Sequence, residues 1–364
     1  MKKISKILIN IFCTLIIFIM LFSFIPITYL IRPQNVNRQN LAGFYAEPDN
    51  SLDMVYIGGS AAFVFWEPLR GFNNFGFTSY NFAHNSIIPL SLQFCVEEVL
   101  KTQSPEVLLI DLRPFQYGDF TGGVDLDTFH EVYIRNCTDN MKYSSTRNKL
   151  IEVSTRTRKS FSYYFDFFKY KSLIPQNIGL MVTKNINYDY IDNEALHPYK
   201  TFLFDYNTVE LTFTDLKSVT EKKELSPKLT QCLIDLLEYC KSRNQKTLFI
   251  VHSYIQEEEH KMKYNFIEEI IESYGFDYLN TNDYYQEIGL DYSKDFYDKD
   301  HVNVFGAEKY TDFLGAYLKE HYTLPDKRND PVFSDWHTLY TEFQRVSNEV
   351  KGVINQKIEE RNQQ

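Results

Sequence analysis

One stretch near the amino terminus, residues 53–62, constrains the fold more than any other. Its sequence, Asp-Met-Val-Tyr-Ile-Gly-Gly-Ser-Ala-Ala, predicts a buried strand that ends in a tight glycine turn. A nearly continuous apolar run is typical of an interior strand in a parallel sheet, and glycines permit turns that β-branched residues cannot make. Ser60 is therefore expected at the carboxyl end of a parallel strand, where open α/β sheets bind their ligands.

Further apolar runs alternate with helical patterns along the chain. Strands are expected at residues 79–83, 107–112, 247–251 and 276–279. Helices are expected at residues 90–101, 227–240, 257–273 and 304–321. This alternation predicts a three-layer α/β domain, built from residues 51–114 and 224–322, with a parallel sheet of about five strands.

The remaining segments surround this domain. Residues 32–50 are polar, contain two prolines and predict a tether. Residues 115–223 lose the periodicity and are rich in aromatics, which predicts an inserted cap or subdomain whose rings either pack together or line a sugar site. Residues 323–364 predict an amphipathic helix that either docks on the domain or binds a partner.

The first 31 residues predict a short cytoplasmic tip and a transmembrane helix. Residues 7–31 are mostly apolar, and a helix rising about 1.5 Å per residue over this length crosses a hydrocarbon core of about 30 Å. Lys2, Lys3 and Lys6 precede the run, so the positive-inside rule places the amino terminus in the cytoplasm and the domain outside. A signal peptide is the alternative, but no small-residue cleavage site follows Pro26, which favours an uncleaved anchor in the cell membrane.

Charge and cysteine content exclude some classes of function. The chain has 38 basic and 48 acidic residues, a formal net charge of −10, and nucleic acids need a basic face, so no nucleic-acid partner is expected. Cys13 lies in the apolar run, and the other cysteines show no paired spacing, so a fold built on disulfides is not expected. These others are Cys95, Cys137, Cys232 and Cys240.

A second stretch, residues 298–307, supplies the groups that would activate a serine. Asp298 and His301 lie three residues apart, just ahead of a helical pattern. With Ser60 they form the parts of a nucleophile, base and orienting carboxylate. The alternative is that Asp298 and His301 cap the helix and Ser60 is an ordinary turn residue. The acidic residues around His301 lack the spacing of common metal sites, so no metal and no cofactor are expected.

The two stretches together resemble the SGNH/GDSL hydrolase superfamily. The Gly-Asp-Ser block of that family is matched by Gly58-Gly59-Ser60, and its Asp-x-x-His block by Asp298 to His301. The resemblance covers about residues 50–322 and implies a flavodoxin-like sheet, with Ser60 as nucleophile, His301 as base and Asp298 as its orienter.

The family blocks that supply oxyanion donors match less well. Those blocks ordinarily offer a glycine amide and an asparagine side chain. Here the glycine position falls near Ser86, and Arg113 stands near the place of the asparagine. Gly59, Ser86, Asn85 and Arg113 are therefore candidates for oxyanion or substrate binding, with His84 as a further polar group. A structural ion pair of Arg113 with a carboxylate is an equal alternative.

Within the superfamily, this architecture looks most like the anchored proteins that work beside membrane-bound O-acyltransferases in D-alanylation of teichoic acid and O-acetylation of alginate. The resemblance implies a serine-dependent O-acyltransferase or esterase acting on acyl, chiefly acetyl, esters of a cell-envelope polysaccharide or teichoic acid. It also implies a membrane-bound O-acyltransferase as a partner. The alternative is a catalytically inactive module of the same fold that binds glycan or such a partner.

Overall fold

The computed structural model describes residues 2–30, 36–117, 128–155, 161–164, 166–173 and 198–363. Its centre is a five-stranded, all-parallel sheet with the strand order β2-β1-β3-β4-β5, which is compatible with a flavodoxin-like fold. The strands are β1 (Met54–Gly58), β2 (Ser79–Ala83), β3 (Val107–Asp111), β4 (Thr247–Val251) and β5 (Asp277–Asn280). The expected five-stranded α/β sheet is therefore confirmed.

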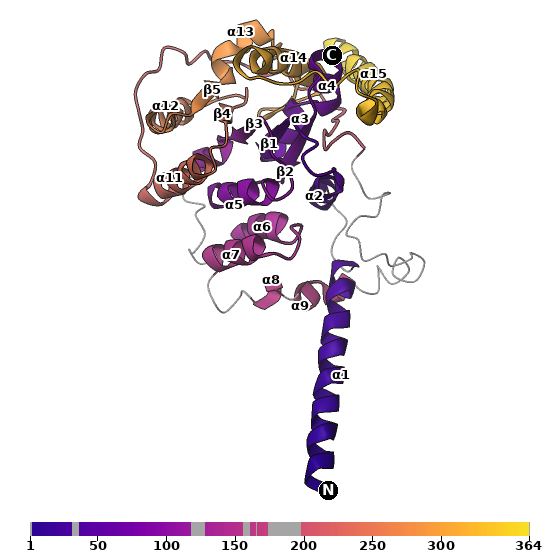
Figure 1. The fold of residues 1–364 in the computed structure, drawn as a ribbon. Helices are drawn as coiled ribbons and strands as arrows, with labels where there is room; N and C mark the ends of the chain where they lie inside the picture. Colours follow the sequence, from indigo (N-terminus) through magenta and orange to yellow (C-terminus); the bar gives the residue numbers. More distant parts are fainter. Residues whose placement is uncertain are drawn as a thin grey trace.

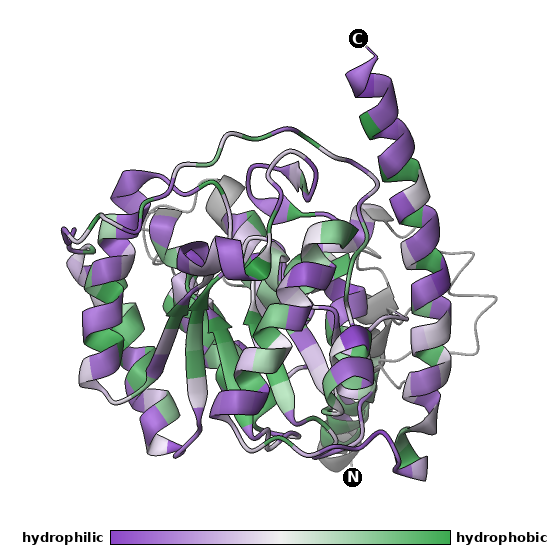
Figure 2. Cartoon of the chain, turned by 90° about the horizontal axis from the view of Figure 1, so that it is seen from above, coloured by the Kyte–Doolittle hydropathy of each residue, from purple (hydrophilic) through white to green (hydrophobic). Residues whose placement is uncertain are grey.

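Helices cover both faces of the sheet and make it the middle of three layers (Figure 1). On one face lie α5 (Pro89–Val99), α11 (Pro227–Ser242) and α12 (Glu258–Ser273). On the other face lie α3 (Ser60–Phe65), α4 (Pro68–Phe75) and α14 (Val304–His321). Because both faces are covered, β1 to β4 are buried along their whole length, and Figure 2 shows the apolar residues concentrated there.

Local signals in the sequence set the ends of these helices. The Ser226 hydroxyl accepts a hydrogen bond from the Leu229 amide, and Pro227 occupies the first helical position of α11. Asn303 caps α14 in the same way, with its side chain accepting from the Phe305 amide. The caps fix where each helix begins, and so fix the loops ahead of them.

The prediction of a tether at residues 32–50 is wrong for residues 36–46. These residues form helix α2 (Val36–Ala46), which packs beside β2 at the edge of the sheet. Leu41 and Phe44 are fully buried, three positions apart on one face, and the Phe44 ring makes an edge contact with Phe82 of β2. Asn40 adds a hydrogen bond from its side-chain amide to the Ala83 carbonyl, so both apolar packing and hydrogen bonding dock this otherwise polar helix at the edge strand.

The first part of the insertion packs as a helical layer on α5. Its described helices are α6 (Thr128–Thr138), α7 (Ser145–Ser154), α8 (Phe161–Tyr164) and α9 (Asp166–Tyr170), with short 3₁₀ turns at Arg113–Tyr117 and Lys171–Leu173. Figure 1 shows α6 and α7 beneath α5. Of the expected aromatics, Tyr163 and Phe202 are buried, which favours packing over a sugar site for these two, whereas Tyr188 and Tyr190 lie outside the described residues.

The carboxyl-terminal helix α15 (Ser334–Asn362) docks on the domain. Docking is one of the two predicted alternatives, the other being a helix that binds a partner. Trp336 and Phe343 join the main core, while Val350 and Ile354 pack against Val304 of α14. Short elements at Thr281–Tyr284, Tyr285–Ile288 (α13) and Pro331–Phe333 complete the chain after β5.

Helix α1 (Lys2–Leu30) extends away from the rest of the molecule (Figure 1). The run predicted as an anchor overlaps it, and residue 31 of that run lies outside the described residues. Within the described part of the chain, no helix combines the length and the apolar character that crossing a membrane requires.

Candidate active site

Ser60 stands at the end of the central strand β1, where the chain turns into α3. Gly58 ends the strand and Gly59 precedes the helix. A Cβ on Gly58 would lie 2.7 Å from the Asp111 Cβ, closer than such atoms approach, so glycine lets the ends of β1 and β3 meet. The glycine pair therefore presents the Ser60 side chain at the carboxyl edge of the sheet, as predicted.

Asp298 and His301 come from a small antiparallel ribbon that the sequence did not predict. Strands β6 (Phe296–Asp298) and β7 (His301–Val302) pair so that Asp298 and His301 lie opposite each other. The Tyr297 ring stacks on the His301 imidazole, with centroids 5.3 Å apart and planes 4° from parallel. The ribbon and the stacked ring hold the imidazole in one orientation.

The three side chains form a continuous hydrogen-bonded chain. The Ser60 Oγ lies 2.7 Å from His301 Nε2, and His301 Nδ1 lies 2.9 and 3.0 Å from the two oxygens of Asp298. An ionised carboxylate can only accept, so Nδ1 carries the proton and Nε2 is left to accept the serine hydroxyl. This is the geometry and tautomer that a serine nucleophile needs.

The Asp298 carboxylate stays ionised in this setting. Partial burial raises its pKa, but the hydrogen bond and charge of His301 and the amide of Asp300 outweigh that effect, so the pKa falls below its ordinary value. The side chain is 46 % exposed, so water screens its charge more than in a deeply buried triad.

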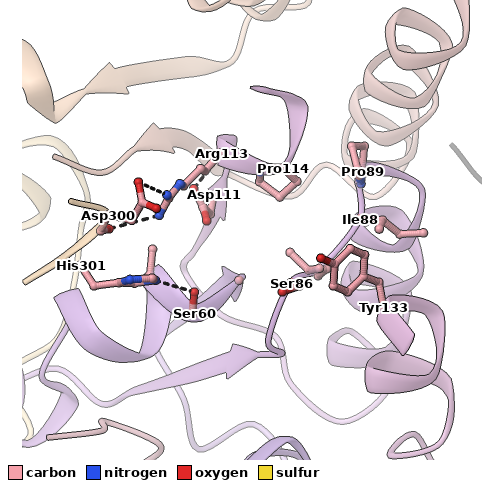
Figure 3. Close-up of a pocket in the computed structure, with 13 residues that line it drawn as sticks. Ser60, Ser86, Ile88, Pro89, Asp111, Arg113, Pro114, Tyr133, Asp300 and His301 are labelled. Atoms are coloured by element: carbon pink, nitrogen blue, oxygen red, sulfur yellow. Dashed lines mark hydrogen bonds and ion pairs between the residues drawn. The ribbon is translucent and has the colours of Figure 1, made fainter. Parts of the chain in front are cut away.

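A cavity of about 300 Å³ opens beside Ser60. Ser60 and His301 face Ser86 and Tyr133 across it (Figure 3). The remaining wall is partly apolar and partly charged. Its apolar members are Ala61, Ile87, Ile88, Pro89 and Pro114, and its charged members are Asp111, Arg113 and Asp300.

Behind the cavity, buried polar groups form a network that ends at the histidine loop. His252 Nδ1 lies 3.3 Å from Asp111, and Arg113 Nη1 lies 3.3 Å from His252 Nε2. Arginine can only donate, so Nε2 accepts and the Nδ1 proton goes to Asp111. Arg113 also pairs with Asp300 at 2.5 Å and donates to the Asp300 carbonyl at 3.1 Å. Arg113 thus ties β3 to the loop that carries His301.

Burial sets the charges in this network. It lowers the pKa of His252 despite the neighbouring Asp111, so the imidazole is neutral. Burial raises the pKa of Asp111, but His252 and the Arg113 amide, which donates to Asp111 at 2.9 Å, bring it below its ordinary value. An ionised Asp111 therefore borders the cavity, close to the Gly58–Gly59 turn.

No protein family matches this chain, and no curated protein is significantly similar to it. The chemistry of the site rests on its own geometry.

The predicted oxyanion and substrate residues are only partly brought together. Gly59 and Ser86 line the cavity, and Ser86 has a left-handed backbone with φ of +55°. Arg113 also lines it, and the alternative of a structural ion pair is confirmed through Asp300. Asn85 is not among the lining residues, because its backbone is held from outside: Asn37 accepts from its amide and Asn136 donates to its carbonyl.

His84 turns away from the cavity, contrary to the prediction that it belongs to the same polar edge. Its ring is fully buried, with Nε2 3.7 Å from the Cys95 Sγ. His84 directly follows the last residue of β2, and its ring also packs on the Phe82 ring of that strand, with centroids 5.5 Å apart.

His252 and Tyr133 were not predicted as site residues. His252 directly follows β4, and its place at the carboxyl end of a parallel strand is a signal that could have identified it. Tyr133 lies on α6 of the insertion, and no local pattern in the sequence marks it.

The acidic residues near His301 are engaged by other groups. Asp295 pairs with Lys309 at 2.6 Å, Asp298 with His301, and Asp300 with Arg113. Each of these carboxylates is therefore already paired with a side-chain nitrogen.

Proposed function

We propose that this protein is a serine-dependent O-acyltransferase or esterase of the SGNH type, acting on acyl esters of a cell-envelope polysaccharide or teichoic acid. One observation carries the proposal: the 2.7 Å contact between Ser60 Oγ and His301 Nε2, across 241 positions of the chain, with Asp298 on the opposite nitrogen. The five-stranded parallel sheet and the Gly-Gly-Ser turn agree with that family.

In the proposed reaction, the Ser60 oxygen attacks the ester carbonyl while His301 Nε2 takes the hydroxyl proton. The imidazolium then gives this proton to the departing alcohol, and the acyl group stays on Ser60 as an ester. A sugar hydroxyl or water then gives its proton to His301 and attacks this ester, and His301 returns the proton to the Ser60 oxygen as the bond between Ser60 and the acyl group breaks. Backbone amides at Gly59 and Ser86 are the proposed donors to the oxyanion, since both residues border the space beside Ser60.

The size of the cavity supports a small acyl group. Its volume of about 300 Å³ is at the lower end for ligand sites, and Ile87, Ile88 and Pro89 give it an apolar wall. An acetyl or alanyl group and part of a sugar ring fit such a space.

Membrane attachment is part of the proposal and rests on the sequence. Lysines precede a run of apolar residues, and from Ile7 to Met20 the large apolar side chains of α1 are exposed. We propose that this segment anchors the chain with the domain outside the cell, where a membrane-bound O-acyltransferase supplies the acyl group. Fractionation and protease accessibility of intact cells test it, and a domain digested only after lysis contradicts it.

The decisive experiment is chemical labelling of Ser60. The purified full-length protein is treated with a fluorophosphonate probe and with an activated acetyl ester, and adducts are mapped by peptide mass spectrometry. Adducts on Ser60, absent in Ser60→Ala and kept in the surface control Ser242→Ala, support the proposal. Unchanged ester turnover by Ser60→Ala would remove this serine from the mechanism.

One observation favours the second candidate, an inactive module that binds glycan or a partner. The carboxylates of Asp111 and Asp300 border the space where an oxyanion would form, and Arg113 is engaged by Asp300. If this candidate is right, glycan binding persists in Ser60→Ala and His301→Ala, and the native protein shows neither turnover nor a Ser60 adduct.

A further inference from the structure

A buried cluster of soft ligand atoms lies outside the set of residues that line the candidate active-site cavity. We call His84, Cys95, Cys137 and Met141 the thiol-imidazole cluster. His84 follows β2, Cys95 lies on α5, and Cys137 lies on α6 with Met141 just after it. All four side chains are at most 1 % exposed, and the three cysteine and histidine ligand atoms lie within 4.8 Å of one another.

The spacing in the cluster matches that of ligands around one metal ion. The Cys95 and Cys137 sulfurs are 3.8 Å apart, and His84 Nε2 is 3.7 Å from the Cys95 sulfur. Zinc bonds of about 2.3 Å to sulfur and 2.0–2.1 Å to nitrogen, arranged tetrahedrally, place two sulfurs about 3.8 Å apart and a sulfur and a nitrogen about 3.6 Å apart. The Met141 sulfur lies 3.6 Å from Cys137 and offers a fourth donor.

Among the described residues, these side chains have few good hydrogen-bond partners. His84 Nδ1 is buried without a hydrogen-bond partner among the described residues, and its Nε2 has a thiol as its neighbour. Thiols are weak hydrogen-bond partners, so the fold buries an imidazole with little compensation. A metal ion bound to the ring would supply that compensation.

We propose that His84, Cys95 and Cys137, with Met141 beside them, bind one thiophilic metal ion, Zn²⁺ or Cu⁺. Two thiolates, an imidazole and a thioether form a soft donor set that selects these ions over the hard ions Mg²⁺ and Ca²⁺. Both cysteines would bind the metal as thiolates, so any thiol proton that they carry is released when the site fills.

The site would join the insertion to the α/β domain. Cys137 and Met141 belong to the insertion, whereas His84 and Cys95 belong to the domain, and Figure 1 shows α6 alongside α5. The same helix carries Asn136, which holds the Asn85 carbonyl, and Tyr133, which lines the active-site cavity. The metal is therefore expected to fix one wall of that cavity, although the proposal does not depend on Ser60 being catalytic.

The test measures metal binding by the full-length protein in detergent, purified with reductant and without oxygen. Metal-free protein is given Zn²⁺ or Cu⁺, desalted and analysed for metal content, with Co²⁺ as an optical reporter of thiolate ligation. We expect about one ion per chain, an upward shift of the melting temperature, and loss of both in the double variant Cys95→Ser, Cys137→Ser. Met141→Leu should weaken Cu⁺ binding more than Zn²⁺ binding, because a thioether is a soft ligand.

The matched control removes the same number of thiols elsewhere. The double variant Cys13→Ser, Cys232→Ser changes two less buried cysteines and should still bind one ion. If the cluster variant fails to fold, alkylation of the wild-type protein decides: metal should protect Cys95 and Cys137 from iodoacetamide. Wild-type protein that binds neither ion, a cluster variant with full metal content, or a Cys95–Cys137 disulfide in protein isolated without reductant would each overturn the proposal.

Discussion

The substitution Asp298→Asn tests whether the carboxylate supports the His301 base. It removes a negative charge that lies 2.9 and 3.0 Å from His301 Nδ1 and changes little else, since the two side chains have nearly the same shape. The amide oxygen of asparagine can still accept the Nδ1 proton. The expected loss therefore comes mainly from the charge that stabilises the imidazolium in the transition state.

The magnitude follows from the exposure of the pair. At about 3 Å, two unit charges interact by about 1.4 kcal/mol in bulk water and by about 5.5 kcal/mol at an effective dielectric constant of 20. Asp298 is 46 % exposed and His301 is 17 % exposed, so the pair lies between these limits. A value near 3–4 kcal/mol corresponds to a rate reduced by about 10²–10³, because about 1.4 kcal/mol is tenfold.

The assay is the second-order rate of Ser60 labelling by a fluorophosphonate, which needs no knowledge of the natural ester. Asp298→Asn should label about 10²–10³ times more slowly than wild type. The control Asp235→Asn, on the exposed side of α11, should label at the wild-type rate. Labelling of Asp298→Asn within threefold of wild type would refute the reasoning, because the carboxylate would then contribute nothing to the base.

Three further predictions concern stability. Arg113→Met should lower the free energy of unfolding by about 1–3 kcal/mol and slow Ser60 labelling, because it leaves the partly buried Asp300 without its partner. Phe343→Ala should cost about 3–4 kcal/mol, because the ring is 2 % exposed and contacts other aromatic rings of the core. Burial and the charge of Glu308 raise the pKa of Glu67 in the folded protein. As the pH rises above the ordinary pKa of a glutamate, Glu67 therefore loses its proton in the unfolded chain but keeps it in the folded protein, and the free energy of unfolding falls. Glu67→Gln cannot titrate, so its stability relative to wild type should increase between about pH 4 and pH 7.

The first two of these predictions have a matched control measured by chemical unfolding. Arg345→Met breaks exposed ion pairs with Glu342 and Glu349 and should change the free energy of unfolding much less than Arg113→Met does. Val353→Ala lies on the same helix as Phe343 but is 39 % exposed, so a change within about 0.5 kcal/mol is expected. Equal effects of Phe343→Ala and Val353→Ala would contradict docking of α15, and parallel pH curves for Glu67→Gln and wild type would contradict a raised pKa.

Particular elements show why the sheet could be predicted from the sequence. The run Val107–Asp111 is apolar up to its last residue, because β3 is buried on both faces and has no polar face to show. Ser226 and Pro227 predict the start of α11, because the serine hydroxyl accepts a hydrogen bond from the Leu229 amide within the first turn and proline suits the first helical position. Such signals are local, so they can be recognised without knowing what packs against them.

Other parts of the site depend on contacts between distant segments. The ribbon that carries Asp298 and His301 is short and lacks strand periodicity, and it forms because Phe296 is buried and bridges to Val209. The pairing of Arg113 with Asp300 and the place of Tyr133 in the cavity wall have no counterpart in local pattern. The helical state of residues 36–46 likewise comes from docking of Leu41 and Phe44 at the sheet edge.

By itself, the sequence determined the five parallel strands, the serine after a glycine turn, and an Asp-x-x-His pair ahead of a helix. Burial periodicity, caps and glycine turns depend on neighbouring residues, so they can be recognised in the sequence directly. Only the tertiary structure decided that Ser60 and His301 come within 2.7 Å, that Asn85 and His84 leave the site, and that two cysteines 42 positions apart meet. These outcomes follow from packing between segments far apart in the chain, which no local pattern encodes.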